Sequence, residues 1–136
     1  SSAASDVYKE TALGLMLLGI IGLQLFASQI CHVFSLSADT EIFATYAIRI
    51  ITLGYLFAGA NIAYQGIFQA LDHGIASLVL SLIRLLVIPL PAAYLLTLTS
   101  SAGKIVWAAV PFGELVGTVA AIVIMGRIKR EIKLKD

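Results

Sequence analysis

Charged residues are scarce in this sequence. Lys, Arg, Asp and Glu together make up 12% of the 136 residues, whereas soluble globular proteins contain about 25%. Apolar residues make up 60% of the chain, and the mean hydropathy is +0.97. This composition indicates an integral membrane protein. Because each helical span needs about 20 residues, a chain of this length holds about four spans and leaves no room for a soluble catalytic domain.

Cysteine is nearly absent too, and this excludes two kinds of site. Cys31 is the one cysteine, so the chain can form neither an internal disulfide nor a zinc site of paired thiolates. The two histidines, His32 and His73, are too far apart to share a metal ion, and no metal site is predicted. The sequence contains no nucleophile and base pair, phosphate-binding loop or metal cluster, so no enzymatic activity and no cofactor are expected.

Four long apolar runs are present instead, and each is a candidate transmembrane helix. They cover residues 11–34, 44–70, 76–98 and 104–126. Short polar separators predict an antiparallel, all-helical bundle, and the alternating pattern of a barrel is absent. Residues 1–10 are expected to be a polar lead-in without structure of their own. Residues 127–136 are expected to be a basic tail.

The basic residues are distributed unevenly, and their distribution predicts the topology. Five of the nine follow the last span, namely Arg127, Lys129, Arg130, Lys133 and Lys135. Because basic residues favour the cytoplasmic side, we expect a multi-pass protein of the cell inner (plasma) membrane with both termini in the cytoplasm. The tail directly follows an apolar run, which favours contact with anionic lipid headgroups over nucleic acid.

Three ionisable residues fall inside the predicted spans, where a charge costs at least about 2.5 to 3.5 kcal/mol on insertion scales. From a rise of about 1.5 Å per helical residue, Glu114 lies near the midplane, and Arg84 lies within about 5 Å of it along the bundle axis. The two either form a structural ion pair, or Glu114 couples transport to a proton or cation or lines a wet cavity. Arg49 is shallower, and its side chain is expected to extend outward to Asp39 or Glu41.

The second span also carries polar side chains spaced three and four residues apart, which places them on one helix face. They are Asn61, Tyr64, Gln65 and Gln69. Such groups either bond helices together or line a water-filled path for a substrate, and the sequence favours neither interpretation.

Proline and glycine predict where the helices bend and where they pack closely. Pro89 and Pro91 remove two backbone donors from the third span, and Pro111 perturbs the fourth, so all three are hinge candidates. Gly113 and Gly117 are four residues apart in the fourth span. This spacing lets two helix backbones approach closely, and we expect it to serve packing within the chain rather than a dimer interface.

Several segments together resemble one transporter family. They are AIRI at 47–50, ANIAYQGIFQA at 60–70, LIRLLVIPL at 82–90, VWA at 106–108 and PFGE at 111–114. In this combination they are similar to the multidrug and toxic compound extrusion (MATE) family, and the similarity covers nearly the whole chain.

The resemblance implies an exporter of twelve helices in two six-helix lobes, of which this chain would supply the last four. Such an exporter exchanges sodium ions or protons for organic, often cationic, drugs by alternating access. Its partners would be the lipid bilayer, the remaining helices and the drug. The chain lacks the first lobe and has no carboxylate in its second span, where some relatives couple to cations. Asp72 and Ile105 stand where the family often has glycine.

Two other functions stay open. A small four-helix multidrug exporter that acts as a dimer fits the length, but its glutamate belongs in the first span, where this chain has none. A membrane assembly subunit without transport would explain the packing motifs and would leave Glu114 paired with Arg84.

Overall fold

The computed structural model describes residues 2–34 and 37–135, and within these residues every element is a helix or a helical turn. The predicted all-helical class is therefore confirmed. The elements in chain order are α1 (Ser2–Val33), α2 (Ala38–Thr52), α3 (Tyr55–Ala70), α4 (Gly74–Leu82), the π-helical turn η1 (Ile83–Val87), α5 (Pro89–Thr97), α6 (Ala102–Ile105), the 3-10 turn η2 (Val106–Ala108) and α7 (Ala109–Lys135).

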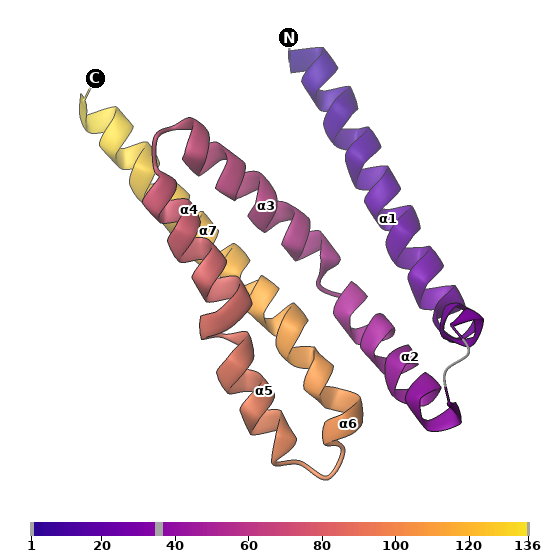
Figure 1. Cartoon of the computed structure of the whole chain (residues 1–136). Coiled ribbons are helices and arrows are strands. Elements are labelled where there is room, and N and C mark those ends of the chain that lie inside the picture. The colour runs from indigo at the N-terminus through magenta and orange to yellow at the C-terminus, as the bar shows by residue number, and fades with distance from the viewer. Residues whose placement is uncertain (1, 35–36, 136) are drawn as a thin grey trace.

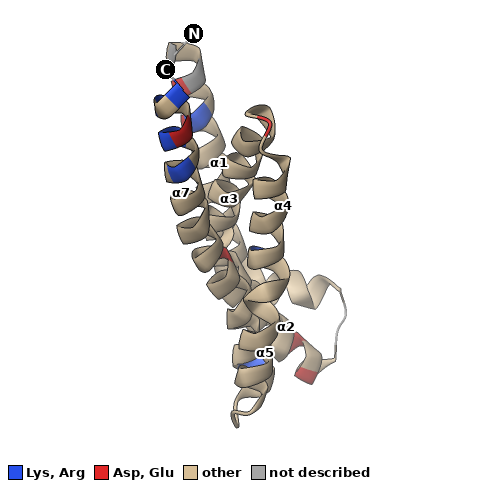
Figure 2. Ribbon diagram, turned by 90° about the vertical axis from the view of Figure 1, so that its left-hand side faces the viewer, with Lys and Arg blue, Asp and Glu red and all other residues tan. Residues whose placement is uncertain are grey.

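The helices form an antiparallel bundle of three to four spans. Three segments are long and apolar enough to cross a membrane, namely Asp6–Val33, Gly74–Thr97 and Ala102–Lys135, and the bent pair of α2 and α3 qualifies as a fourth. Both termini and the turn from α3 to α4 lie at one end of the bundle, and the other two turns lie at the opposite end (Figure 1). The Lys and Arg residues of the α7 C-terminus gather at the end that holds both termini (Figure 2).

Both ends of the chain are more helical than predicted. Residues 1–10 were expected to be a polar lead-in outside the first span and without structure of their own, but α1 begins at Ser2; residue 1 lies outside the described residues. The basic tail continues α7 as far as Lys135. Neither 2–10 nor 127–135 contains proline or glycine, so nothing in these segments stops a helix that the adjoining span has already nucleated.

The second predicted span, 44–70, is not one continuous helix. It consists of α2 and α3, which are bent by 50° at the break. At the break Gly54 lies against Pro111 of α7, and a Cβ on Gly54 would lie 2.7 Å from the Pro111 Cα. The close contact needs glycine at this position.

A side chain from α1 donates hydrogen bonds to acceptors in the last turn of α2. The Gln24 amide donates to the Arg49 carbonyl and to the Thr52 hydroxyl, both at 2.6 Å. The broken helix thus exposes polar backbone that a neighbouring helix bonds, as membrane interiors require. Gln24 acts here as a contact between helices.

The irregularity predicted by Pro89 takes the form of the π-helical turn η1. The Ile88 amide donates to the Ile83 carbonyl, five residues back, at 3.2 Å. Pro89 then occupies the first position of α5, where its missing N–H removes no helical bond.

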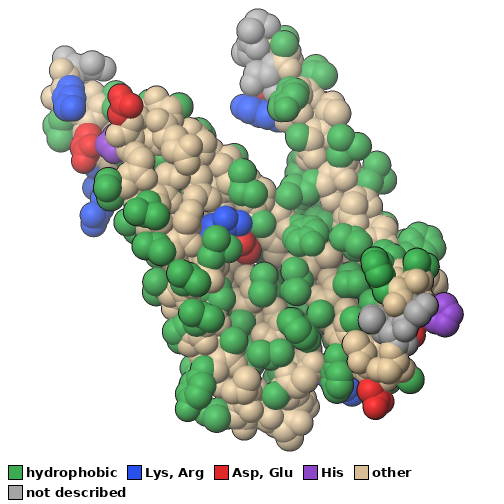
Figure 3. Space-filling view, viewed as in Figure 1, with side chains coloured by type: hydrophobic (Ala, Val, Ile, Leu, Met, Phe, Trp, Pro, Cys, Tyr) green, Lys and Arg blue, Asp and Glu red, His purple; other side chains and the backbone are tan. Residues whose placement is uncertain are grey.

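The buried apolar core lies where α3, α4 and α7 meet. It contains Phe68, Leu80, Ala121 and Ile128. α1 contacts mainly α2, Met16 lies against Gly59 of α3, and the N-terminal end of α1 stands apart from α3 and α7 (Figure 1). Large apolar side chains cover much of the outer surface (Figure 3), as expected for helices that face lipid or further helices.

Candidate functional site

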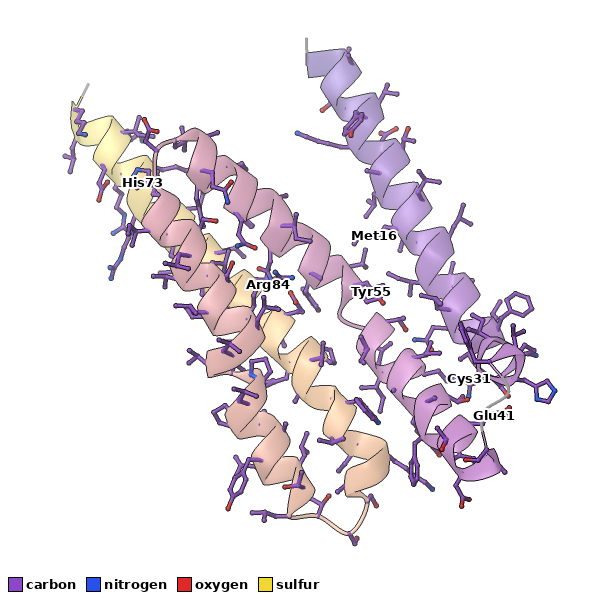
Figure 4. All side chains as sticks on the ribbon, in the orientation of Figure 1. Met16, Cys31, Glu41, Tyr55, His73 and Arg84 are labelled. Carbon is purple, nitrogen blue, oxygen red and sulfur yellow. The ribbon has the colours of Figure 1, made fainter. Side chains whose placement is uncertain are left out.

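Arg84 of η1 and Glu114 of α7 meet in the middle of the bundle. The Arg84 Nη2 lies 2.9 Å from the Glu114 Oε1, and the Arg84 Nε donates to Oε2 at 2.9 Å. The two side chains are 11% and 7% exposed. The parallel contacts form the bidentate geometry that is strongest between a guanidinium and a carboxylate. The predicted proximity of the two residues is therefore confirmed, and Figure 4 shows Arg84 at the centre of the bundle.

Asn61 of α3 binds the same carboxylate. Its side chain is fully buried, and its amide nitrogen donates to the Glu114 Oε2 at 2.8 Å and to the Glu114 carbonyl at 3.0 Å. The Thr118 hydroxyl lies 3.2 Å from the Asn61 Oδ1 and 3.0 Å from the Glu114 carbonyl. One carboxylate therefore ties together α3, η1 and α7.

Gln65 extends this network toward α4. Its carbonyl oxygen accepts from the Arg84 Nη1 at 3.4 Å, while its amide donates to the Ser77 carbonyl at 3.1 Å and to the Ser81 hydroxyl. One turn further on, the Gln69 amide donates to the Ser77 hydroxyl at 2.9 Å. The two glutamines and the two serines form a hydrogen-bonded seam between α3 and α4.

Tyr64 does not join this network. Its ring packs against Phe68 with centroids 6.1 Å apart, and it borders the apolar core. Of the four residues on the predicted polar stripe, Asn61 and Gln65 contact the ion pair, Gln69 bonds α4, and Tyr64 belongs with the core.

Two glycines of α7 allow the charged groups to come this close. A Cβ on Gly117 would lie 2.9 Å from the Arg84 Cβ and 3.0 Å from the Asn61 amide nitrogen, and a Cβ on Gly113 would lie 2.7 Å from the Arg84 carbonyl. The small-residue motif therefore serves close packing inside this chain, as its spacing predicts.

Two of the three hinge candidates also contact glycine. Pro89 lies against Gly113, where a Cβ would be 2.6 Å from the proline Cγ, and Pro111 lies against Gly54. Pro91 is exposed. The break in the second span therefore lies against Pro111 of the fourth span, and Pro89 of the third span lies against Gly113 of the fourth. Both contacts are close to the cluster of Arg84, Glu114 and Asn61, which we call the clamp.

Arg49 departs from its predicted contact. In the described part of the chain it makes no ion pair with Asp39 or Glu41, and the Glu41 carboxylate lies 3.6 Å from His32 instead. Glu41 and Arg49 are separated by two helical turns, about 12 Å along α2, and their side chains do not close this distance. The side chain of Arg49 is exposed.

Three residues of the network were missed by the sequence reasoning. Thr118 follows Glu114 by four residues and so lies on the same helix face. Ser77 and Ser81 repeat on α4 the four-residue spacing of Gln65 and Gln69 on α3. This matching spacing could have indicated that the two pairs face each other.

The arrangement limits what chemistry the site can perform. Donors from Arg84 and Asn61 engage both oxygens of the carboxylate, so a cation or proton that binds Glu114 competes with Arg84 for it. Within residues 2–34 and 37–135 no three His, Cys, Asp or Glu side chains gather as a metal site. The cluster can hold three helices together, and it can change state if Arg84 is released.

Comparison with known proteins identifies one family. The MatE family model matches residues 3–95, about two thirds of the chain. The matched region contains Asn61, Gln65, Gln69 and Arg84, whereas Glu114 follows it. No curated protein and no solved structure matches the chain.

Proposed function

Because the chain belongs to the MatE family of multidrug and toxic compound extrusion transporters, we propose that it forms the last four helices of a twelve-helix, two-lobe exporter. The proposed activity is the exchange of sodium ions or protons for organic, often cationic, drugs by alternating access. The family match over residues 3–95 is the observation that carries this proposal. It favours a transporter of this family over an enzyme, a small dimeric exporter or an assembly subunit.

The proposed location is the cell inner membrane, with both termini in the cytoplasm. The apolar spans support the membrane, and the basic residues at the end that holds both termini support the orientation. Lys9 belongs to this end as well, whereas Lys104 follows the turn after α5 at the opposite end.

The proposed role of the cluster is a clamp inside one moving unit. Arg84, Glu114 and Asn61 join α3, η1 and α7 through buried, charge-assisted bonds, which are roughly twice as strong as neutral ones. Two contacts lie at the edge of the unit formed by α3, η1 and the middle of α7. Pro89 contacts Gly113 where this unit meets α5, and Pro111, near the start of α7, contacts Gly54 where the unit meets α2. In many secondary transporters discontinuous helices of this kind lie at the substrate and ion sites, around which one group of helices moves against another.

Transport in proteoliposomes tests the proposed activity. The protein, expressed at its natural full length, is reconstituted, and ethidium accumulation is followed after a sodium or proton gradient is imposed. We expect accumulation with at least one gradient and its collapse when an ionophore dissipates that gradient. Residues 1–136 alone should not transport, because a site between two repeats needs both of them. The proposal would be contradicted if the folded full-length protein accumulates no ethidium under a sodium gradient and none under a proton gradient.

A further inference from the structure

A second site lies well away from the clamp, between the C-terminal part of α1 and α2. It is a cavity of about 560 Å³, a size within the range of about 300 to 1,000 Å³ that is usual for small-molecule sites. Its lining residues come from both helices and are Ser28, Ala38, Glu41, Ile42, Thr45, Tyr46 and Arg49. Figure 4 shows Glu41 and Cys31 at this corner of the molecule, far from Arg84.

The cavity has a charged residue at each end and both polar and apolar side chains between them. Glu41, Thr45 and Arg49 follow one another at four-residue spacing, so they lie along one face of α2. Glu41 lies near the turn that precedes α2, and Arg49 lies about 12 Å further along the helix. Ile42 and Tyr46 supply the apolar wall between the two charged residues.

Of the two charged residues that line the cavity, one has a partner among the described residues and the other does not. In the described residues Glu41 is engaged by His32 at 3.6 Å, whereas the guanidinium of Arg49 makes no hydrogen bond or ion pair. Lys104 lies close by, with its Nζ 5.3 Å above the Tyr46 ring. Arg49 is therefore the charged lining residue that no described residue pairs.

We propose that this cavity binds the anionic group of an amphiphilic molecule through Arg49. A charge placed inside a membrane span is expensive without a partner, and a guanidinium binds planar or tetrahedral oxyanions through paired hydrogen bonds. The apolar part of the ligand would lie against Ile42 and Tyr46, and Ser28 would add a hydroxyl donor. The anion, a carboxylate, sulfonate or phosphate, belongs either to a dissolved compound or to a lipid headgroup.

This site is separate from the proposed export of cationic drugs, since it selects the opposite charge and its test measures binding alone. The full-length protein is placed in nanodiscs of phosphatidylcholine, and carboxyfluorescein binding is followed by fluorescence anisotropy. Rhodamine 6G, a cationic dye with the same ring system, serves as the matched ligand. Arg49→Gln should weaken carboxyfluorescein binding by about tenfold or more, the usual worth of a hydrogen bond to a charged group, and should leave rhodamine 6G binding unweakened.

Two further variants and a lipid measurement complete the test. Arg130→Gln, on the exposed end of α7, controls for general charge and should have no effect on carboxyfluorescein binding. Ser28→Trp fills the cavity without altering Arg49 and should abolish dye binding, so the proposal stays testable if Arg49→Gln folds poorly. Native mass spectrometry with phosphatidylglycerol counts retained lipids in the same variants.

The outcomes separate the two sources of the anion. Dye binding that depends on Arg49 and Ser28 assigns the site to dissolved anions, and phosphatidylglycerol retention that depends on them assigns it to a lipid headgroup. The proposal is wrong if Arg49→Gln and Ser28→Trp change neither quantity relative to the unmodified protein.

Discussion

The clamp can be tested by removing its two charges separately and together. Glu114→Gln keeps the shape of the side chain but leaves the Arg84 guanidinium, which is 11% exposed, without a carboxylate. Removing one partner of a buried pair typically costs about 3 to 5 kcal/mol, whereas removing both is often close to neutral. The double variant should therefore recover stability that the single variants lose.

The structure sets the expected magnitudes. Glu114→Gln should lower the free energy of unfolding by about 3 kcal/mol, a change of about two orders of magnitude in the folding equilibrium. Arg84→Gln should cost less, about 2 kcal/mol, because Asn61 still donates to the stranded carboxylate at 2.8 Å. The double variant should lie within about 1 kcal/mol of the unmodified protein, so the coupling energy should be at least about 4 kcal/mol.

Equilibrium unfolding of the full-length protein in mixed detergent and dodecyl sulfate micelles, followed by circular dichroism, measures these differences. Glu131→Gln, on the exposed end of α7, is the matched control and should change stability by less than about 0.5 kcal/mol. Additive losses in the double variant would refute the reasoning, since they would mean that the two charges do not stabilise each other.

Export by the same variants separates the two roles considered for Glu114. A structural clamp predicts that the refolded double variant still exports ethidium. A coupling group predicts that Glu114→Gln folds but loses or alters the dependence of export on the ion gradient. Normal gradient-driven export by a stably folded Glu114→Gln protein would exclude the coupling role.

Three further predictions concern packing, the backbone and topology. Gly113→Ala should destabilise by about 1 to 3 kcal/mol in the same unfolding assay, because its Cβ would lie 2.7 Å from a backbone carbonyl of η1, whereas Gly126→Ala, with open space around it, should be neutral or stabilising. Asp72 has a φ of 63°, so Asp72→Gly should stabilise by up to about 1 kcal/mol, and an equal or lower melting temperature would contradict this. With Cys31 replaced by alanine, Ser100→Cys should react with an impermeant thiol reagent added from outside the cell; protection there, with labelling from the cytoplasmic side, would invert the topology.

How far the sequence predicted the site can be judged from its polar residues. Depth arithmetic brought Arg84 and Glu114 together correctly, because a helix rises by a fixed amount per residue and both residues lie at the same height in antiparallel neighbours. The same arithmetic could not place Arg49, because height alone does not say which way a long side chain turns. The predicted stripe placed Asn61 and Gln65 on one helix face, where both contact the ion pair. It also included Tyr64, whose ring packs against the apolar core instead.

The sequence by itself determined that this is a helical membrane protein and predicted four spans, because the hydrocarbon core requires long apolar segments whose backbone bonds are satisfied internally. Its residue patterns also determined the family. The tertiary structure decided where those spans break. The gap between α2 and α3 depends on Pro111 and Gln24 of other helices, and the π-helical turn packs its backbone against Gly113. These contacts join residues far apart in the chain, so no local pattern in residues 44–70 or 76–98 contains them.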